Sequence, residues 1–89
     1  MFALDFGSRV PIYKQVEDNS VSLAAMQVLK TNARLPSVRA LASELGVNPN
    51  TVQRAYHTLE QEGVIYTVSG KGSFIADASY ASRLLLKRK

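Results

Sequence analysis

The sequence predicts one mainly α-helical domain that carries a small β-hairpin, and three observations lead to this fold class. Two apolar stripes with helical spacing flank a short turn at residues 46–49, and a strand–turn–strand pattern follows at 64–76. The chain has 89 residues, of which 46% are hydrophobic, which suits one small domain with its own core. Together these features predict a winged helix-turn-helix, a three-helix core plus a wing, over residues 1–76, and a short C-terminal helical segment over 77–89.

The helix-turn-helix lies between Leu35 and Gly63. Its first helix is predicted by apolar residues at i, i+3, i+4 and i+7, namely Val38, Leu41, Ala42 and Leu45. Gly46 can end this helix because glycine tolerates positive φ, while Asn48 offers an N-cap and Pro49 suits the first position of the next helix. The second helix repeats the stripe with Val52, Ala55, Tyr56 and Leu59. A helix stop and a helix start so close together predict two short helices that cross steeply.

The N-terminal part of the chain carries weaker signals. Apolar residues alternate with polar or small ones in residues 1–10, which predicts an extended segment. Residues 11–30 predict a helix whose apolar face is interrupted by Asn19 and Ser20. The apolar positions of that face are Ile12, Val16, Leu23 and Val28. In the connector that follows, Asn32 is the best candidate for a left-handed cap.

A β-hairpin is predicted directly after the second central helix. Residues 64–68 and 73–76 are rich in β-branched and aromatic residues, and 69–72 form a glycine-containing turn. A hairpin in this position is typical of the wing of a winged helix. We expect Asp77 or Ser79 to cap a last helical segment, whose shared face consists of Tyr80, Leu84 and Leu85.

Charge and composition restrict the class of function. The net charge of +4 and the pI of about 9.7 favour a polyanionic partner such as double-stranded DNA. With no cysteine there is no disulfide, thiolate nucleophile or cysteine-based zinc site, and the single histidine, His57, has no partner spacing for a metal. No nucleophile motif is present. We therefore expect no enzyme activity, no cofactor and no metal. No apolar run has the length of a membrane span, so we expect no membrane partner and a cytoplasmic protein.

The polar face of the second central helix is the predicted DNA-reading surface. Residues step by about 100° along a helix, so the side opposite the apolar stripe is centred on Asn50, Gln53, Arg54 and His57. Asparagine and glutamine pair with adenine, and arginine pairs with guanine or phosphate. The alternative, an ordinary solvated face, is disfavoured by the preceding helix, the tight turn and the hairpin, which a groove-docking helix requires.

Phosphate contacts are predicted at the ends of the elements. Ser37 and Arg39 begin the first central helix, whose free N–H groups suit a phosphate, and Thr51 lies in the first turn of the second helix. The alternative is that Ser37 only caps and Arg39 is merely solvated. Gly70 and Lys71 belong to a Gly-Lys-Gly sequence without the spacing of a phosphate-binding P-loop, and they make better sense as the tip of a wing.

The motifs LPSVRALASELGVNPNTVQRAYHTLEQEGVIYTVSGKGSFI and VPIYKQV closely resemble GntR-family bacterial transcription regulators. The variant NPNTVQRAY, with LEQEG and GKGSF, is most similar to the YtrA subfamily. The resemblance covers about residues 10–76. It implies a homodimeric regulator, usually a repressor, that binds an inverted-repeat operator, responds to a small-molecule effector and dimerises through a C-terminal helical region. The DNA contacts that it implies fall on Ser37, Arg39, Asn48, Asn50, Thr51, Gln53, Arg54, Gly70 and Lys71.

The chain departs from the family pattern in two ways. Gln27 and Thr31-Asn32 replace a customary glycine and a Pro-Gly turn, and Ser20 replaces an apolar residue, so we expect looser packing of the first helix or a shifted helix boundary. Only twelve residues, ASYASRLLLKRK, follow Asp77, whereas the subfamily normally has a longer helical tail. This indicates a truncated chain or an abbreviated dimerisation segment.

Two other functions stay open at this point. The chain fits the N-terminal DNA-binding part of a longer regulator with an aminotransferase-like domain, as in the related MocR subfamily, although no residue here binds pyridoxal phosphate. It also fits a winged helix used for protein–protein contact, with a docking face of Tyr80, Leu84, Leu85 and Leu86. That third function predicts weak DNA binding without sequence preference.

Overall fold

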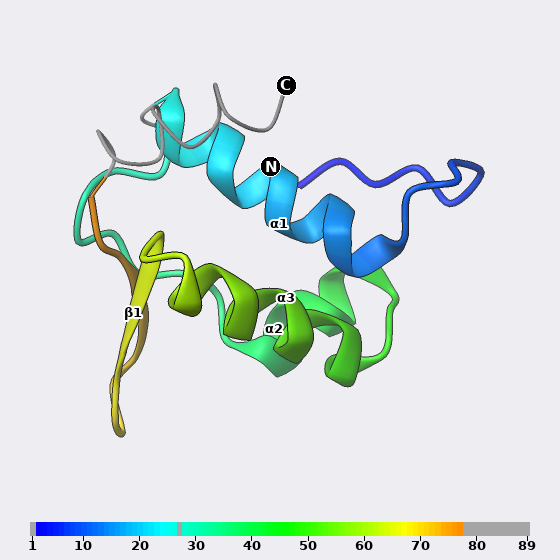
Figure 1. The fold of residues 1–89 in the computed structure, drawn as a ribbon. Coiled ribbons are helices and arrows are strands. Elements are labelled where there is room, and N and C mark those ends of the chain that lie inside the picture. The colour runs from blue at the N-terminus through cyan, green and yellow to red at the C-terminus, as the bar shows by residue number, and fades with distance from the viewer. Residues whose placement is uncertain (1, 27, 78–89) are drawn as a thin grey trace.

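The computed structural model describes residues 2–26 and 28–77, and it confirms a helical core followed by a hairpin (Figure 1). The elements in chain order are α1 (Ile12–Ala25), α2 (Val38–Leu45), α3 (Pro49–Gln61), β1 (Ile65–Val68) and β2 (Gly72–Ile75). Gln27 and the predicted C-terminal helical segment, including its proposed cap at Ser79 and the face of Tyr80, Leu84, Leu85 and Leu86, lie outside the described residues.

Helix α1 begins where the sequence predicts and ends earlier. Pro11 is its N-cap residue, but the helix stops at Ala25, before the predicted end at residue 30. Val28 is therefore not on its apolar face and is 55% exposed, which corrects the prediction. Ser20 occupies the apolar face fully buried, because its hydroxyl donates to the Val16 carbonyl one turn earlier at 2.9 Å. A polar residue is thus accommodated there without an unpaired buried group.

The N-terminal arm, residues 2–10, forms no paired strand, and its residues 6–10 make a turn and a bend where the sequence predicts an extended segment. Amide side chains of α1 take the place of a neighbouring strand. Asn19 accepts from the Ala3 N–H through Oδ1 at 2.9 Å and donates to the Ala3 carbonyl through Nδ2 at 3.1 Å. Gln15 binds Asp5 in the same two-way fashion, at 2.7 and 2.9 Å. The interruption of the apolar stripe at Asn19 is therefore an attachment point for the arm.

The turn between α2 and α3 follows the predicted capping chemistry. Gly46 ends α2 in the left-handed conformation, with φ of 70°. The Asn48 side chain accepts a hydrogen bond from the Asn50 N–H at 2.8 Å, and Pro49 occupies the first turn of α3. These short-range bonds set the direction of α3 relative to α2.

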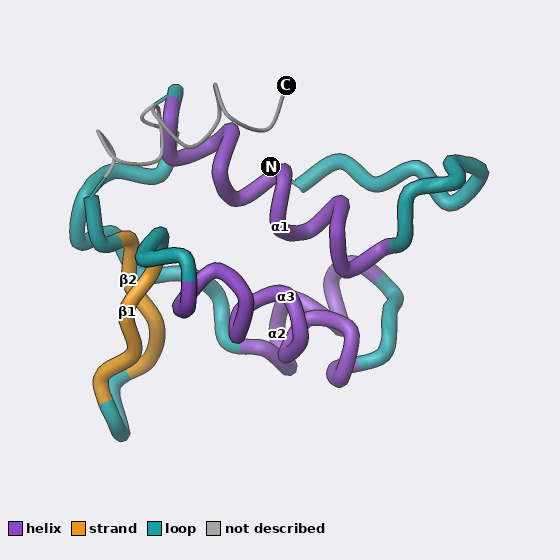
Figure 2. The backbone as a smooth tube through the Cα atoms, in the orientation of Figure 1, coloured by secondary structure: helices purple, strands orange, loops and turns teal. Residues whose placement is uncertain are grey.

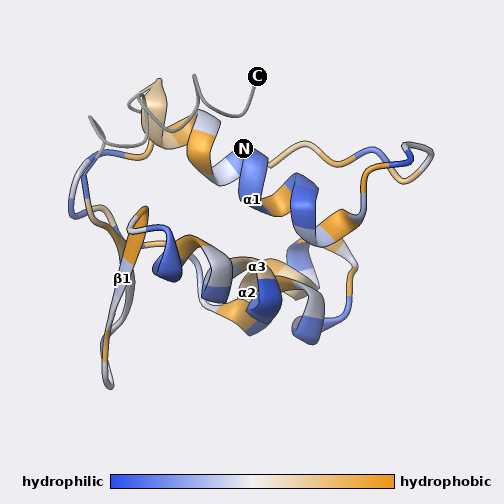
Figure 3. Ribbon diagram, in the orientation of Figure 1, coloured by the Kyte–Doolittle hydropathy of each residue, from blue (hydrophilic) through white to orange (hydrophobic). Residues whose placement is uncertain are grey.

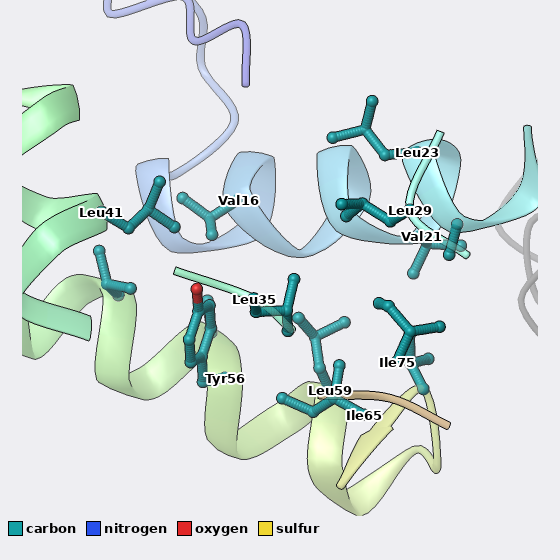
Figure 4. Close-up of a cluster of buried hydrophobic side chains, with 14 of the residues drawn as sticks. Val16, Val21, Leu23, Leu29, Leu35, Leu41, Tyr56, Leu59, Ile65 and Ile75 are labelled. Atoms are coloured by element: carbon teal, nitrogen blue, oxygen red, sulfur yellow. The ribbon is translucent and has the colours of Figure 1, made fainter. Parts of the chain in front are cut away.

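Helix α3 packs against both other helices and supplies the centre of the core (Figure 2). Its buried residues are the predicted stripe, Val52, Ala55, Tyr56 and Leu59. Figure 4 shows Leu35 and Ile75 in the space between α1, which carries Val21, and α3, which carries Leu59, so loop and hairpin residues complete the core. Hydrophobic and hydrophilic residues alternate along the helices in Figure 3, as expected of elements with one buried face.

The hairpin is antiparallel, with Ile65 opposite Ile75 and Val68 opposite Gly72. A third segment joins it along β2. The Asn32 N–H donates to the Ile75 carbonyl at 2.7 Å, and the Leu35 N–H donates to the Ser73 carbonyl at 2.8 Å. Asn32 adopts the predicted left-handed conformation, with φ of 66°. The sequence does not predict this third segment, which ties the loop before α2 to the wing.

Candidate nucleic-acid interface

The outer side of α3 presents the polar residues that the sequence assigns to base recognition. Asn50, Gln53, Arg54 and His57 are all exposed, while the stripe on the opposite side is buried. Within the described residues, the side chains of Asn50, Gln53 and His57 make no hydrogen bond or ion pair. Their amide and imidazole groups are therefore available to an incoming partner.

Arg54 differs from its neighbours because α1 holds it. Its guanidinium carbon lies 3.8 Å from the centroid of the Tyr13 ring, in cation–π geometry. One residue along a helix is a rotation of about 100°, so Arg54 marks the α1 edge of the polar face, while Gln53 lies farther from α1. The part of the face that is clear of α1 is formed by Asn50, Gln53 and His57.

The two helix-capping residues that the sequence assigns to DNA contact, Ser37 and Asn48, are partly engaged in the fold. The Ser37 hydroxyl oxygen accepts from the Ala40 N–H at 3.1 Å, so its O–H remains able to donate. The Asn48 Oδ1 is occupied by the Asn50 N–H, which leaves the two N–H groups of Nδ2 for a contact outside the protein. Both residues are exposed, and both can cap a helix and donate to a phosphate at the same time.

Arg39 and Thr51 lie in the first turns of α2 and α3. Arg39 is exposed, and its guanidinium has no ion pair with any residue in the described ranges. Thr51 is half-buried, and its side-chain hydroxyl makes no hydrogen bond to another described residue. Both groups are placed beside helix N-termini, where backbone N–H groups and the helix dipole favour an anion.

The tip of the wing carries one cation between two glycines. The Lys71 N–H donates to the Val68 carbonyl at 2.9 Å and closes the turn, while the Lys71 side chain is exposed. Gly70 needs glycine for its backbone, because its φ is 78° although no atom would meet a Cβ within 4 Å. The hairpin extends beyond the helices on the side away from α1 (Figure 2). Lys71 lies in the turn between β1 and β2, because Val68 pairs with Gly72, and it is therefore at the tip of the wing.

Tyr56 fixes the position of α3 relative to the start of α2. The side chain is 4% exposed, and its hydroxyl donates to the Pro36 carbonyl at 2.7 Å. Burial of the hydroxyl raises the pKa of Tyr56 above its ordinary value. The residue therefore stays a neutral donor and anchors the buried side of the helix whose other side is the candidate reading surface.

The sequence missed two residues that the fold brings to this surface. Tyr13 was not assigned to the interface, yet it holds Arg54. Arg34 was treated as part of a connector, yet its side chain lies across Gly72 of the wing. The approach of Arg34 to the hairpin depends on the third-segment pairing, which has no signal in the local sequence.

Other classes of site are not found in the described part of the chain. No group of three or more histidine, cysteine, aspartate or glutamate side chains there could hold a metal ion. The same residues enclose no pocket. None of the described helices has the length and apolar character needed to cross a membrane.

The sequence matches a family of known proteins over most of the described fold. The match is to bacterial regulatory proteins of the gntR family and covers residues 12–75. The HTH-type transcriptional repressor YtrA of Bacillus subtilis (strain 168) is 42% identical over 77 residues, a region that is 86% of this chain and 59% of that relative. The chain thus spans well under two thirds of that relative's length.

Solved structures agree with this match. YtrA from Sulfolobus acidocaldarius, described as a GntR-family transcription factor, is 38% identical with a TM-score of 0.80, and the match covers 98% of this chain and 94% of that one. The DNA-binding domain of AraR, solved in complex with its operator ORE1, is 26% identical with a TM-score of 0.73, over 85% of this chain and 93% of that one. The predicted winged helix-turn-helix is therefore confirmed.

Proposed function

The chain belongs to the gntR family of bacterial regulatory proteins and carries its DNA-binding fold, and we propose that it is a sequence-specific transcriptional repressor acting as a homodimer on an inverted-repeat operator. The observation that carries this proposal is the free polar face of α3, where Asn50, Gln53 and His57 are exposed beside a wing with an exposed Lys71. A rigid amphipathic helix with base-reading side chains on its free face suits the major groove.

The residues divide into two roles in this proposal. Gln53 and Asn50 read base edges, because their amides can donate and accept at one adenine, and His57 extends the same face. The groups that contact the sugar–phosphate backbone set the register of the helix in the groove. They are Ser37, Arg39, Asn48, Thr51, Gly70 and Lys71. Arg54, held at the α1 edge by Tyr13, is assigned to a phosphate beside the groove.

Dimerisation is part of the proposal because one short helix and one wing make a small interface. Two half-sites, read by two copies of α3, supply the affinity and specificity that operator binding needs. We assign the dimer contact to the C-terminal segment, residues 77–89, through Tyr80, Leu84 and Leu85, and the DNA-binding domain to residues 1–76. A repressor of this kind acts in the bacterial cytoplasm, and a small-molecule effector would control it by changing operator affinity.

Two alternatives make different predictions. A MocR-like regulator fused to an aminotransferase domain would require a much longer native chain, and the 42% identity with a short repressor does not favour it. A winged helix used for protein contact would bind duplex DNA weakly, with no preference among sequences. DNA selection separates this last function from a sequence-reading repressor.

The experiment is a selection of bound duplexes from a random-sequence pool with the full chain. We expect enrichment of an inverted repeat whose half-site centres are about 10 base pairs, or a multiple of that, apart. The Gln53→Ala variant, run in parallel, should enrich a less defined half-site. A pool that stays random after repeated rounds with the wild-type chain would contradict sequence-specific binding.

A further inference from the structure

Arg34 lies on the wing although it belongs to the loop before α2. Its backbone forms an isolated antiparallel bridge with Phe74 of β2. The hydrogen bonds on either side of this bridge, between Leu35 and Ser73 and between Asn32 and Ile75, hold the loop against the hairpin. The Arg34 side chain therefore starts from a fixed backbone position.

The side chain runs from the base of the hairpin toward its tip. Phe74 and Gly72 are two residues apart on one strand, so they face the same side of the hairpin. A Cβ placed on Gly72 would lie 3.0 Å from the Arg34 Nε, 3.5 Å from one terminal nitrogen and 3.6 Å from Cζ. The guanidinium group thus covers Gly72, the residue next to Lys71, and a Cβ there would force the Arg34 side chain to shift.

This guanidinium has no acidic partner among residues 2–26 and 28–77. Arg34 is exposed, and no hydrogen bond or ion pair to its side chain is formed within these ranges. An arginine that is laid along a strand next to a lysine, without a carboxylate to neutralise it, concentrates positive charge near the wing tip. Its planar set of N–H donors matches the oxygens of a phosphate.

We propose that Arg34 is a second DNA-contacting cation of the wing, whose guanidinium binds a backbone phosphate next to the one bound by Lys71. The inference rests on the DNA binding proposed above and adds a residue to that surface. Gly72 has a specific part in it, because the missing Cβ leaves the space in which the guanidinium lies.

The test is the salt dependence of binding to a random-sequence DNA duplex, which needs no knowledge of the operator. Each phosphate contact adds about 0.9 to the slope of log K against log salt concentration, so Arg34→Gln should lower the slope by about that amount and weaken binding roughly five- to tenfold near 0.1 M salt. Arg34→Lys keeps the charge and should keep most of the slope. The matched control is Arg9→Gln, which removes one exposed cation from the N-terminal arm, far from the wing (Figure 1), and should leave the slope unchanged.

The salt slopes of the variants distinguish four outcomes. An unchanged slope in Arg34→Gln, with a lowered slope in Lys71→Gln, would overturn the role of Arg34 and leave the DNA-binding wing intact. Equal losses in Arg34→Gln and Arg9→Gln would also overturn it, because the effect would then be one of net charge. A loss of slope in Arg34→Lys as large as in Arg34→Gln would mean that the side chain acts by packing on Gly72. If neither Lys71→Gln nor Gln53→Ala changed binding to any duplex, the proposed function itself would fail.

Discussion

The guanidinium carbon of Arg54 on α3 lies 3.8 Å from the ring centroid of Tyr13 on α1. The contact joins the exposed side of the candidate recognition helix to α1, a helix to which we assign no DNA contact. The contact therefore favours one orientation of the Arg54 side chain in the free protein, and α1 contributes to the surface through a half-buried aromatic ring.

A double-mutant cycle on Tyr13 and Arg54 measures this contact. We expect the two residues to be coupled by about 0.5–1 kcal/mol in the free energy of unfolding, as is usual for a cation–π pair near the surface. Tyr13→Leu removes the ring, so replacing Arg54 should cost less stability in that background than in wild type. Tyr13→Phe keeps the ring, so replacing Arg54 should cost as much as in wild type. Urea denaturation of the four proteins in the cycle gives the value, and additive effects within error would show that the contact has no energetic weight.

Replacing Tyr56 by phenylalanine tests the buried anchor of α3. The change removes the hydrogen bond to the Pro36 carbonyl and should lower the free energy of unfolding by about 0.5–1.5 kcal/mol near neutral pH. Tyr66→Phe, which removes an exposed hydroxyl that donates to Asn32, serves as the control and should cost less.

The same variant tests the raised pKa of Tyr56. The native state holds the phenol proton more tightly than the unfolded chain does, so the associated stability is complete below the unfolded pKa of about 10 and is lost as pH rises above it. The stability gap between wild type and Tyr56→Phe should therefore narrow above about pH 10. A gap that stays constant over that range would contradict the pKa shift.

Gly72→Ala should destabilise the wing. Residue 72 has φ of 120°, and the new methyl group would meet the Arg34 Nε at 3.0 Å, so we expect a cost of about 1–3 kcal/mol in the free energy of unfolding. Gly7→Ala is the matched control, since its φ is not positive and its nearest atom would lie at 3.4 Å, and it should change stability by less than about 0.5 kcal/mol. Equal costs for the two variants would argue against a special conformation at Gly72.

Two changes at Asn48 separate its capping role from its proposed contact with DNA. Asn48→Ala removes the acceptor for the Asn50 N–H and should lower the free energy of unfolding by about 1 kcal/mol. Asn48→Asp keeps an acceptor and should retain the stability, but it replaces the Nδ2 donor with a negative charge and should weaken DNA binding. Unchanged DNA affinity in Asn48→Asp would remove Asn48 from the interface.

The parts of the fold that local sequence determines were predicted well. The caps at Ser37 and Asn48, the left-handed Gly46 and the repeated apolar stripes set the ends and buried faces of α2 and α3. The end of α1 was not predicted, because the apolar pattern continues to Val28 and no strong stop signal precedes it. Ser20 was expected to loosen the packing of α1, because its hydrogen bond to the Val16 carbonyl cannot be inferred from the apolar pattern.

The missed features of the candidate site depend on contacts between distant segments. The 100° step along α3 places Arg54 on the polar face, but only the packing of α1 brings Tyr13 beneath it. Arg34 reaches the wing because residues 32–35 pair with β2. The two segments are about forty residues apart, and residues 32–35 show no alternating apolar pattern that would predict a strand. Local motifs predicted the candidate reading helix, whereas the contacts of Tyr13 and Arg34 could be found only in the structure.

The central claim is that the free face of α3 reads base sequence, and Gln53→Ala tests it most directly. Binding of wild type and variant should be measured on the selected operator and on a random duplex at one salt concentration. We expect the variant to lose about 1–3 kcal/mol of discrimination between the two, while Lys71→Ala weakens both duplexes alike. Equal losses on operator and random DNA for Gln53→Ala would contradict the claim.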